Sequence, residues 1–171
     1  EIGCGSGAFL LPFYKRNINC FGSDYSSKFI KNCKKLMSKG VFIKSEANNL
    51  KKFKKYKFNY VFIHSVFQYF DNIRYATQVM NQLKKISQKG TKIFILDVPN
   101  IKKKKVWKND MIKKIDRNEF EKKYSKLKHL FYPISFFEKF CKKNNFSLNN
   151  ISKLKLKKQS SKYRFNLMIK I

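Results

Sequence analysis

The first seven residues, 1–7, combine an acid with three glycines at every second position. Glycine adopts backbone angles that a side chain would forbid, and it leaves no Cβ between the main chain and a ligand. Gly3, Gly5 and Gly7 therefore predict the turn after the first strand of an open α/β sheet, where such folds bind ligands. Glu1 could accept a hydrogen bond from a ligand ammonium group. An ordinary glycine-rich turn is the alternative, because three glycines alone are weak evidence.

Two further acids come at the ends of short apolar segments. Asp24 ends a predicted strand at 18–24, about 20 residues past the glycines, where a carboxylate can accept both hydroxyls of a ribose. Glu46, followed by Ala47, comes just after a predicted strand at 41–43. The carboxyl ends of parallel strands share one edge of a sheet, so we expect these acids near the glycine turn.

The elements that must position these residues follow from hydrophobic periodicity. Apolar residues at helical spacing predict helices at 8–16, 26–39, 72–88 and 134–141, with Pro12 disturbing the first unless it falls in the opening turn. Continuous apolar runs predict buried strands at 60–63 and 93–96. Periodicity is weak over 111–127.

The tail differs in kind, because apolar and polar residues alternate there. Leu154 and Leu156 alternate with lysines, and 163–169 shows the same period of two. With a turn at 157–161 between them, these segments predict an antiparallel hairpin.

Together the elements predict one α/β domain over 1–171, a Rossmann-like, doubly wound and mostly parallel sheet that ends in an antiparallel hairpin. Because Glu1 already stands at the end of the first strand, we expect that strand to be truncated. A variable insertion is expected at about 99–133. No apolar run is long enough to span a bilayer, so no membrane partner is expected.

The formal net charge is +30, from 40 Lys and Arg against 10 Asp and Glu. One interpretation is a nucleic-acid partner. The other interpretation is compositional drift. It is favoured because nearly all the basic residues are lysine, whereas proteins selected to bind nucleic acid commonly use arginine. Non-specific binding to nucleic acid at low salt follows in either case.

The cysteines, Cys4, Cys20, Cys33 and Cys141, form no CxxC pair. They match neither a zinc site nor a disulfide framework, so we expect no metal, reduced thiols and a cytoplasmic location.

With these residues described, the chain resembles the class I S-adenosylmethionine-dependent methyltransferases. The stretch 1–7 resembles that family's acid followed by G-x-G-x-G, and 45–50 resembles its G-D-A-x-x-L. The segment 58–61 resembles the F-D-x-V that opens the fourth strand, with Asn59 in place of the acid, and Glu46 replaces a shorter Asp. The resemblance covers residues 1 to about 100.

The resemblance implies S-adenosylmethionine as cofactor. Glu1 and the glycine turn would hold its methionine part, and Asp24 its ribose. Glu46 and Ala47 would flank the adenine, with Phe42 or Tyr25 as an apolar wall. The fingerprint Gly3-x-Gly5-x-x-Ala8 also fits a dinucleotide, so an NAD-dependent oxidoreductase stays open.

Methyl transfer to a hydroxyl could use a general base. His64, at the end of the fourth strand, is the first candidate, Asp97 the second and Tyr69 the third. The alternative for His64, a packing histidine at a strand end, is the more common case. Trp107 could line a substrate lid or pack it to the body, and His129 is expected at the surface.

The expected methyl acceptor is a small molecule with a hydroxyl, such as a sugar. The segment 63–69 lacks the N-P-P-Y signature for amines of DNA bases or glutamine. An RNA methyltransferase and a non-catalytic nucleic-acid-binding domain are the alternatives, and the sequence leaves the oligomeric state open.

Overall fold

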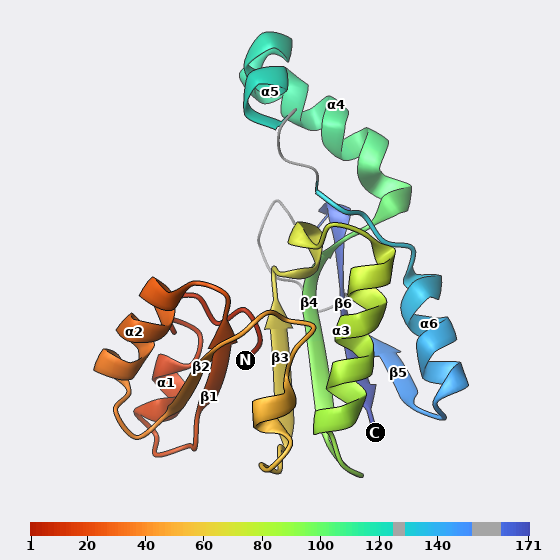
Figure 1. The fold of residues 1–171 in the computed structure, drawn as a ribbon. Helices are drawn as coiled ribbons and strands as arrows, with labels where there is room; N and C mark the ends of the chain where they lie inside the picture. Colours follow the sequence, from red (N-terminus) through yellow and green to blue (C-terminus); the bar gives the residue numbers. More distant parts are fainter. Residues whose placement is uncertain (125–128, 152–161) are drawn as a thin grey trace.

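The computed structural model describes residues 1–124, 129–151 and 162–171 (Figure 1). In one half of the sheet, β1 (Phe21–Asp24) pairs in parallel with β2 (Val41–Lys44). In the other half, β3 (Tyr60–His64) pairs in parallel with β4 (Lys92–Pro99). These strands lie where the apolar runs predicted them, and long crossovers keep them parallel.

The sheet ends in antiparallel strands. β6 (Arg164–Lys170) runs antiparallel to β4 and also to β5 (Ser147–Asn150), which gives the order β3-β4-β6-β5. The first strand of the hairpin is therefore 147–150. The expected strand at Leu154 and Leu156 and the turn at 157–161 lie outside the described residues.

Ile2 joins the two halves of the sheet. It forms parallel bridges to Ser23 of β1 and to Ile63 of β3, and its N–H donates to the carbonyl of Phe62 at 2.9 Å. The N-terminus consequently lies between β1 and β3 (Figure 1). The full order, β2-β1-Ile2-β3-β4-β6-β5, confirms the predicted Rossmann-like sheet.

The helices agree with the predicted positions but are mostly shorter than the patterns that indicated them. Asn72 caps the N-terminus of α3 with its side chain, as Ser26 caps that of α2. Pro12 falls in the first turn of α1, where a missing N–H costs little. The helix bounds are α1 (Leu11–Tyr14), α2 (Ser27–Leu36), α3 (Ile73–Ile86), α4 (Lys104–Ile115), α5 (Arg117–Tyr124) and α6 (Ile134–Lys143). Short 3₁₀ turns are η1 (Lys51–Phe53), η2 (Phe67–Tyr69) and η3 (Ile101–Lys103).

The main core lies on one face of the sheet, under α3 and α6 (Figure 1). Ile63, Ile95 and Leu167 point to this face from three neighbouring strands and have no exposed surface. The alternate residues, such as Phe62 and Met168, face the other way and are only half-buried. Strand alternation thus places one set of side chains in a closed core and the other on a less covered face.

The segment expected as a variable insertion contains two helices, α4 and α5, which project beyond the carboxyl ends of the strands (Figure 1). We call residues 104–124 the arm. Asp116, with a positive φ of 53°, separates its two helices. Asp110 of α4 pairs with Lys162 at 2.5 Å and accepts a hydrogen bond from Tyr163, which fastens the arm to the start of β6.

Trp107 packs within the arm and against the body. Its ring lies 5.9 Å from that of Phe120 and 5.5 Å from that of Phe131, measured between centroids. Of the two predicted roles, these contacts support packing. Among the described helices, none combines the length and the apolar character that crossing a membrane requires.

Leu167→Ala should lower the free energy of unfolding by about 2–5 kcal/mol, because the cavity that it leaves lies in the closed core between strands and helices. Met168→Ala is the matched control on the same strand. Its side chain faces the half-covered side, so its loss should be clearly smaller. Chemical denaturation of both variants measures the difference, and equal losses would contradict this assignment of the two faces.

Candidate active site

The glycine turn has the backbone that its sequence predicts. Gly3 and Gly5 have φ values of +71° and +51°, which favour glycine. A Cβ on Gly3 would lie 2.4 Å from Cγ2 of Val66, whereas one on Gly5 would meet nothing within 4 Å. Gly3 is therefore required by packing, and Gly5 faces open space that a ligand could use. Gly7 is buried against Met37 and Cys33.

Asp24 links this turn to the end of β1. Its Oδ2 accepts the N–H of Gly5 and its Oδ1 accepts the N–H of Ser26, both at 2.9 Å. The carboxylate is buried, with a residue exposure of 7%. Each oxygen can accept a second hydrogen bond, so Asp24 can hold the loop and still bind a ligand hydroxyl.

A cavity of about 510 Å³ opens beside the turn, at the carboxyl ends of the strands. Seven of the residues predicted for the site line it: Gly3, Asp24, Tyr25, Glu46, Ala47, His64 and Tyr69. Glu1, Gly5, Gly7 and Asp97 do not belong to this lining. The fold thus brings together residues that are far apart in sequence, from the turn to the ends of β1, β2 and β3.

Glu1 lies close to the turn but outside the cavity lining. Burial raises the pKa of its carboxyl to about 7, and the nearby Asp24 carboxylate also raises it. Its Oε2 is buried and has no hydrogen-bond partner among the described residues. A buried, unpaired carboxylate oxygen is costly, and a cationic ligand group would remove that cost.

The wall near Glu46 is aromatic. Tyr75 donates its hydroxyl to Oε2 of Glu46 at 3.2 Å, and burial raises the pKa of Tyr75, with Glu46 adding to the shift. Tyr25 and Phe29 also line the cavity and remain 69% and 41% exposed. Phe42, expected as an alternative wall, is wrong for that role, because it is buried in a separate apolar cluster.

His64 ends β3 and is exposed at the cavity, with its ring 6.1 Å from that of Phe9. Tyr69, also exposed, forms an edge contact with His129 at 5.5 Å. His129 is therefore not a simple surface residue, because its ring also lies 6.5 Å from that of Trp107. Burial lowers the pKa of His129, and the positive charge of Arg164 lowers it further.

Asp97, the second candidate base, belongs to a polar network at the end of β4. Its Oδ2 accepts a hydrogen bond from Oγ of Ser65 at 2.5 Å and pairs with Nη1 of Arg164 at 3.2 Å. The same Nη1 donates to Oε1 of Gln68 at 2.7 Å. These contacts engage the Asp97 carboxylate with the protein itself.

Sequence reasoning missed several residues that line the cavity. Asp71 lies on the loop before α3, and Tyr75 lies in the first turn of α3. Hydrophobic periodicity gave no reason to select either residue. Phe29 belongs to the apolar spacing that predicted the helix at 26–39, and that spacing did not indicate a role at the cavity. The scarcity of acids in this chain could have indicated Asp71, since it stands in the segment between β3 and α3.

The charge of the cavity is opposite to that of the protein. Three carboxylates line it, from Asp24, Glu46 and Asp71, and none of its described lining residues is lysine or arginine. The whole chain carries 40 lysines and arginines. The cavity therefore favours a ligand with positive charge. No three His, Cys, Asp or Glu side chains come together as a metal site in the described part of the chain.

A family profile described as "Methyltransferase domain" matches residues 1–95, more than half of the chain. The chain belongs to the class I S-adenosylmethionine-dependent methyltransferase family. S-adenosylmethionine is the cofactor of this family, and the residues present fit it. Glu1 offers an unpaired buried oxygen, Gly5 faces open space, and the cavity is acidic. A comparison with curated proteins found no match.

Solved methyltransferase structures share the fold. The plantazolicin methyltransferase BamL, in complex with an analogue and SAH, superposes with a TM-score of 0.71 at 19% identity, covering 99% of this chain and 75% of BamL. Magnesium protoporphyrin IX methyltransferase from Synechocystis PCC 6803 has a TM-score of 0.68 at 16% identity, covering 99% and 71%. The PH0226 protein from Pyrococcus horikoshii OT3 has a TM-score of 0.69 at 15% identity, covering 98% and 77%.

Proposed function

We propose that this methyltransferase transfers the methyl group of S-adenosylmethionine to a hydroxyl of a small, uncharged molecule such as a sugar. The observation that carries the proposal is the acidic cavity within a strongly basic chain. The cofactor has a sulfonium and an ammonium group against one carboxylate, so carboxylates around it stabilise its bound form. The pyrophosphate of NAD would instead face the three cavity acids, which is unfavourable.

The cofactor would lie along the strand ends from the glycine turn to β2. Asp24 would accept hydrogen bonds from the ribose hydroxyls. Glu46 and Ala47 would flank the adenine, with the exposed ring of Tyr25 as an apolar wall. Glu1 would accept a hydrogen bond from the cofactor ammonium. The cofactor supplies an electrophilic methyl group.

The acceptor would lie on the His64 and Tyr69 side of the cavity, towards the arm. Holding the hydroxyl in line with the methyl group lowers the barrier by orientation alone. His64 would take the hydroxyl proton, since its exposed side chain lines the cavity. Asp97 is less suited to this role because Ser65 and Arg164 already engage its carboxylate.

The acidity of the cavity also weighs against the alternatives. An RNA acceptor would bring phosphates towards Asp71 and Glu46, without a lysine or arginine in the described lining to offset the repulsion. A non-catalytic nucleic-acid-binding domain would have no use for an acidic, aromatic-walled cavity. A small uncharged acceptor meets neither difficulty.

Calorimetry with S-adenosylmethionine and with NAD tests the cofactor assignment. Asp24→Ala should weaken S-adenosylmethionine binding by about 10- to 100-fold, because a charged acceptor of two hydroxyl bonds is worth about 1.5–3 kcal/mol. Glu138→Gln, on the exposed side of α6, is the matched loss of one carboxylate outside the cavity and should leave the affinity unchanged. Binding of NAD but not of S-adenosylmethionine would reject the assignment.

Cofactor binding should release a proton from Glu1. With a pKa of about 7, its carboxyl is partly protonated in the free protein at neutral pH. A bound ammonium group favours the carboxylate, so the pKa falls on binding and affinity rises from about pH 6 to about pH 8. Calorimetry in two buffers of different ionisation enthalpy counts the proton. Glu1→Gln should abolish the release, and an unchanged release would exclude Glu1 as its source.

His64→Ala should lower turnover by about 10²- to 10⁴-fold if His64 is the base. S-adenosylmethionine affinity should stay nearly unchanged, since the methyl group and not the adenosyl part faces His64. Single-turnover assays with an acceptor found by screening hydroxyl compounds measure this. A loss below about tenfold would indicate that orientation alone drives transfer. Asp97→Asn, tested in parallel, separates the two candidate bases.

A further inference from the structure

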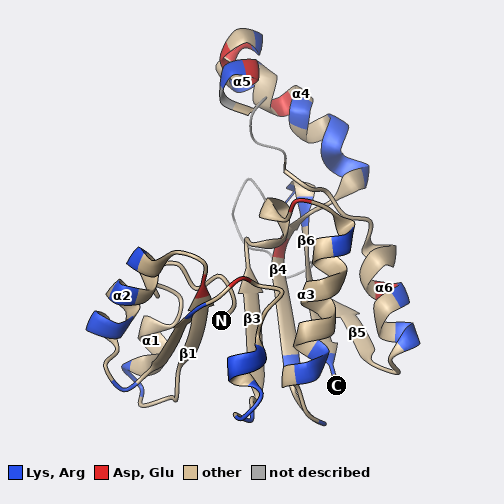
Figure 2. Ribbon diagram, viewed as in Figure 1, with Lys and Arg blue, Asp and Glu red and all other residues tan. Residues whose placement is uncertain are grey.

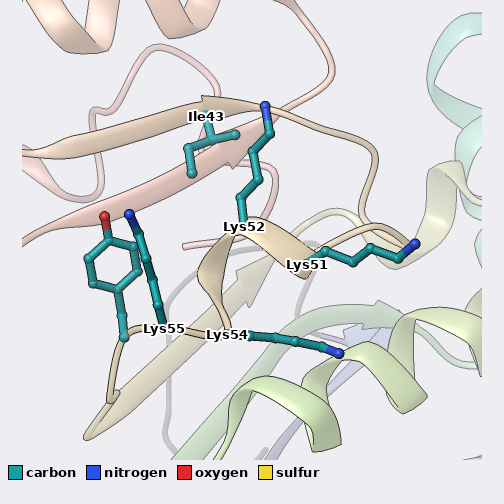
Figure 3. A pocket seen from close by; sticks show the side chains of 6 residues that line it. Ile43, Lys51, Lys52, Lys54 and Lys55 are labelled. Atoms are coloured by element: carbon teal, nitrogen blue, oxygen red, sulfur yellow. The ribbon is translucent and has the colours of Figure 1, made fainter.

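A second pocket, of about 410 Å³, lies away from the candidate active site, around η1 and the loop that leads into β3. Figure 3 shows the six side chains that line it. Four of them are lysines, and the others come from Ile43 of β2 and Tyr56. The pocket lining is thus basic, in contrast to the acidic lining of the cavity at the carboxyl ends of the strands.

The lysines of this pocket spread apart instead of converging on one point. In Figure 3, Lys52 and Lys55 point upwards, Lys52 beside Ile43, while Lys51 and Lys54 point to the right. All four side chains are exposed. A single small anion would need convergent ammonium groups, whereas spread groups match a ligand with several anionic centres in a row.

The residues around the pocket add positive charge, and few carboxylates balance it. Residues 47–96 contain ten Lys and Arg, of which four are the pocket lysines, but only one acid, Asp71, which lies at the opposite edge of the sheet. Lys92 and Lys170 are direct cross-strand partners, an arrangement of like charges that is destabilising without an anion. Among the described residues, no carboxylate pairs with any of these lysines or with Lys51, Lys52, Lys54 and Lys55.

Figure 2 shows how the charges separate along the strands. The acids outside the arm and α6 lie at the carboxyl ends, by the glycine turn, the cavity and Asp97. Lys and Arg lie at the amino ends of β3 and β4 and at the end of α3, and also on α2, α4 and α6. Along the strands themselves, a polyanion is therefore attracted to the amino ends of β3 and β4 and repelled from the acidic cavity.

Aromatic rings accompany the lysines at this edge. Nζ of Lys55 lies 5.2 Å from the centre of the Tyr56 ring, and Nζ of Lys92 lies 6.0 Å from that of Tyr60. Tyr60 is 57% exposed at the start of β3. Tyr56 is half-buried, so Tyr60 is the ring that a base could reach. An exposed ring near cationic side chains matches the way in which single strands are held, with bases stacked on rings and phosphates on cations.

We propose that the pocket lysines at 51–55, with Tyr60 and Lys92, form a docking surface for single-stranded nucleic acid at the amino edge of the sheet. Lysines contact phosphates as point charges and read no bases, so the surface tolerates any sequence. The bound strand is an anchor and not the methyl acceptor, because the cavity lies at the other edge. The proposal does not depend on which small molecule is methylated.

The test is fluorescence anisotropy with a labelled oligouridylate of about 15 nucleotides and the whole chain, titrated at several salt concentrations. The quadruple variant K51Q/K52Q/K54Q/K55Q should bind at least tenfold more weakly, and its slope of log affinity against log salt should be smaller by about 2–3. The matched control is K28Q/K31Q/K34Q/K35Q, which removes four exposed lysines from α2. It should lose less than about threefold, because α2 lies outside the docking surface.

Substitution of Tyr60 is an independent test of the same surface, since it changes no charge. Tyr60→Ala should weaken binding by about fivefold or more, whereas Tyr60→Phe keeps the ring and should stay within about twofold. Thermal melting checks that each variant is folded. Equal losses in the two quadruple variants would overturn the proposal, because total charge would then explain the binding. Tighter binding to phosphatidylserine vesicles than to the oligonucleotide would overturn it as well.

Discussion

The backbone ladder at Ile2 is the contact on which the arrangement of the sheet depends. Within the described residues, β1 and β2 meet β3 and β4 through the bridges of Ile2 to Ser23 and Ile63. Ile2 is itself buried, so its hydrogen bonds are made away from water, where an unpaired backbone group is costly. The ladder aligns the end of β1 with the end of β3. Asp24 and His64 therefore line one cavity although 40 residues separate them in the chain.

Asp24 holds local structure together and also lines the candidate site. Its two oxygens bind the N–H groups of Gly5 and Ser26, which joins the glycine turn, the end of β1 and the start of α2. Its carboxylate also lines the cavity, whose charge is opposite to that of the chain. Because no lysine or arginine is among the described residues that line the cavity, a strongly basic domain can still offer a site that favours a cationic ligand.

The sequence predicted well where a local physical rule applied. Glycines at 3 and 5 adopt the positive φ that their type allows, and the apolar runs at 60–63 and 93–96 form the buried strands. It predicted less well where contacts between distant segments decide. Phe42 and Phe29 both fit apolar spacing, yet Phe42 is buried in a core cluster and Phe29 faces the cavity. Spacing assigns a residue to a face of an element but does not say what covers that face.

The sequence by itself indicated the family, through the resemblance of 1–7, 45–50 and 58–61 to its motifs. Local backbone preference and periodicity indicated most of the strands and helices and placed the acids and glycines at the strand ends. Only the tertiary structure decided which of those residues share a cavity. It engaged Asp97 with Arg164 and Ser65 and left His64 exposed, and it placed His129 against Tyr69. It also gathered three carboxylates in the cavity at the carboxyl ends of the strands and four lysines in the pocket around η1. These outcomes depend on which side chains meet across the sheet, and such long-range pairing is set by packing and charge, not by neighbours in sequence.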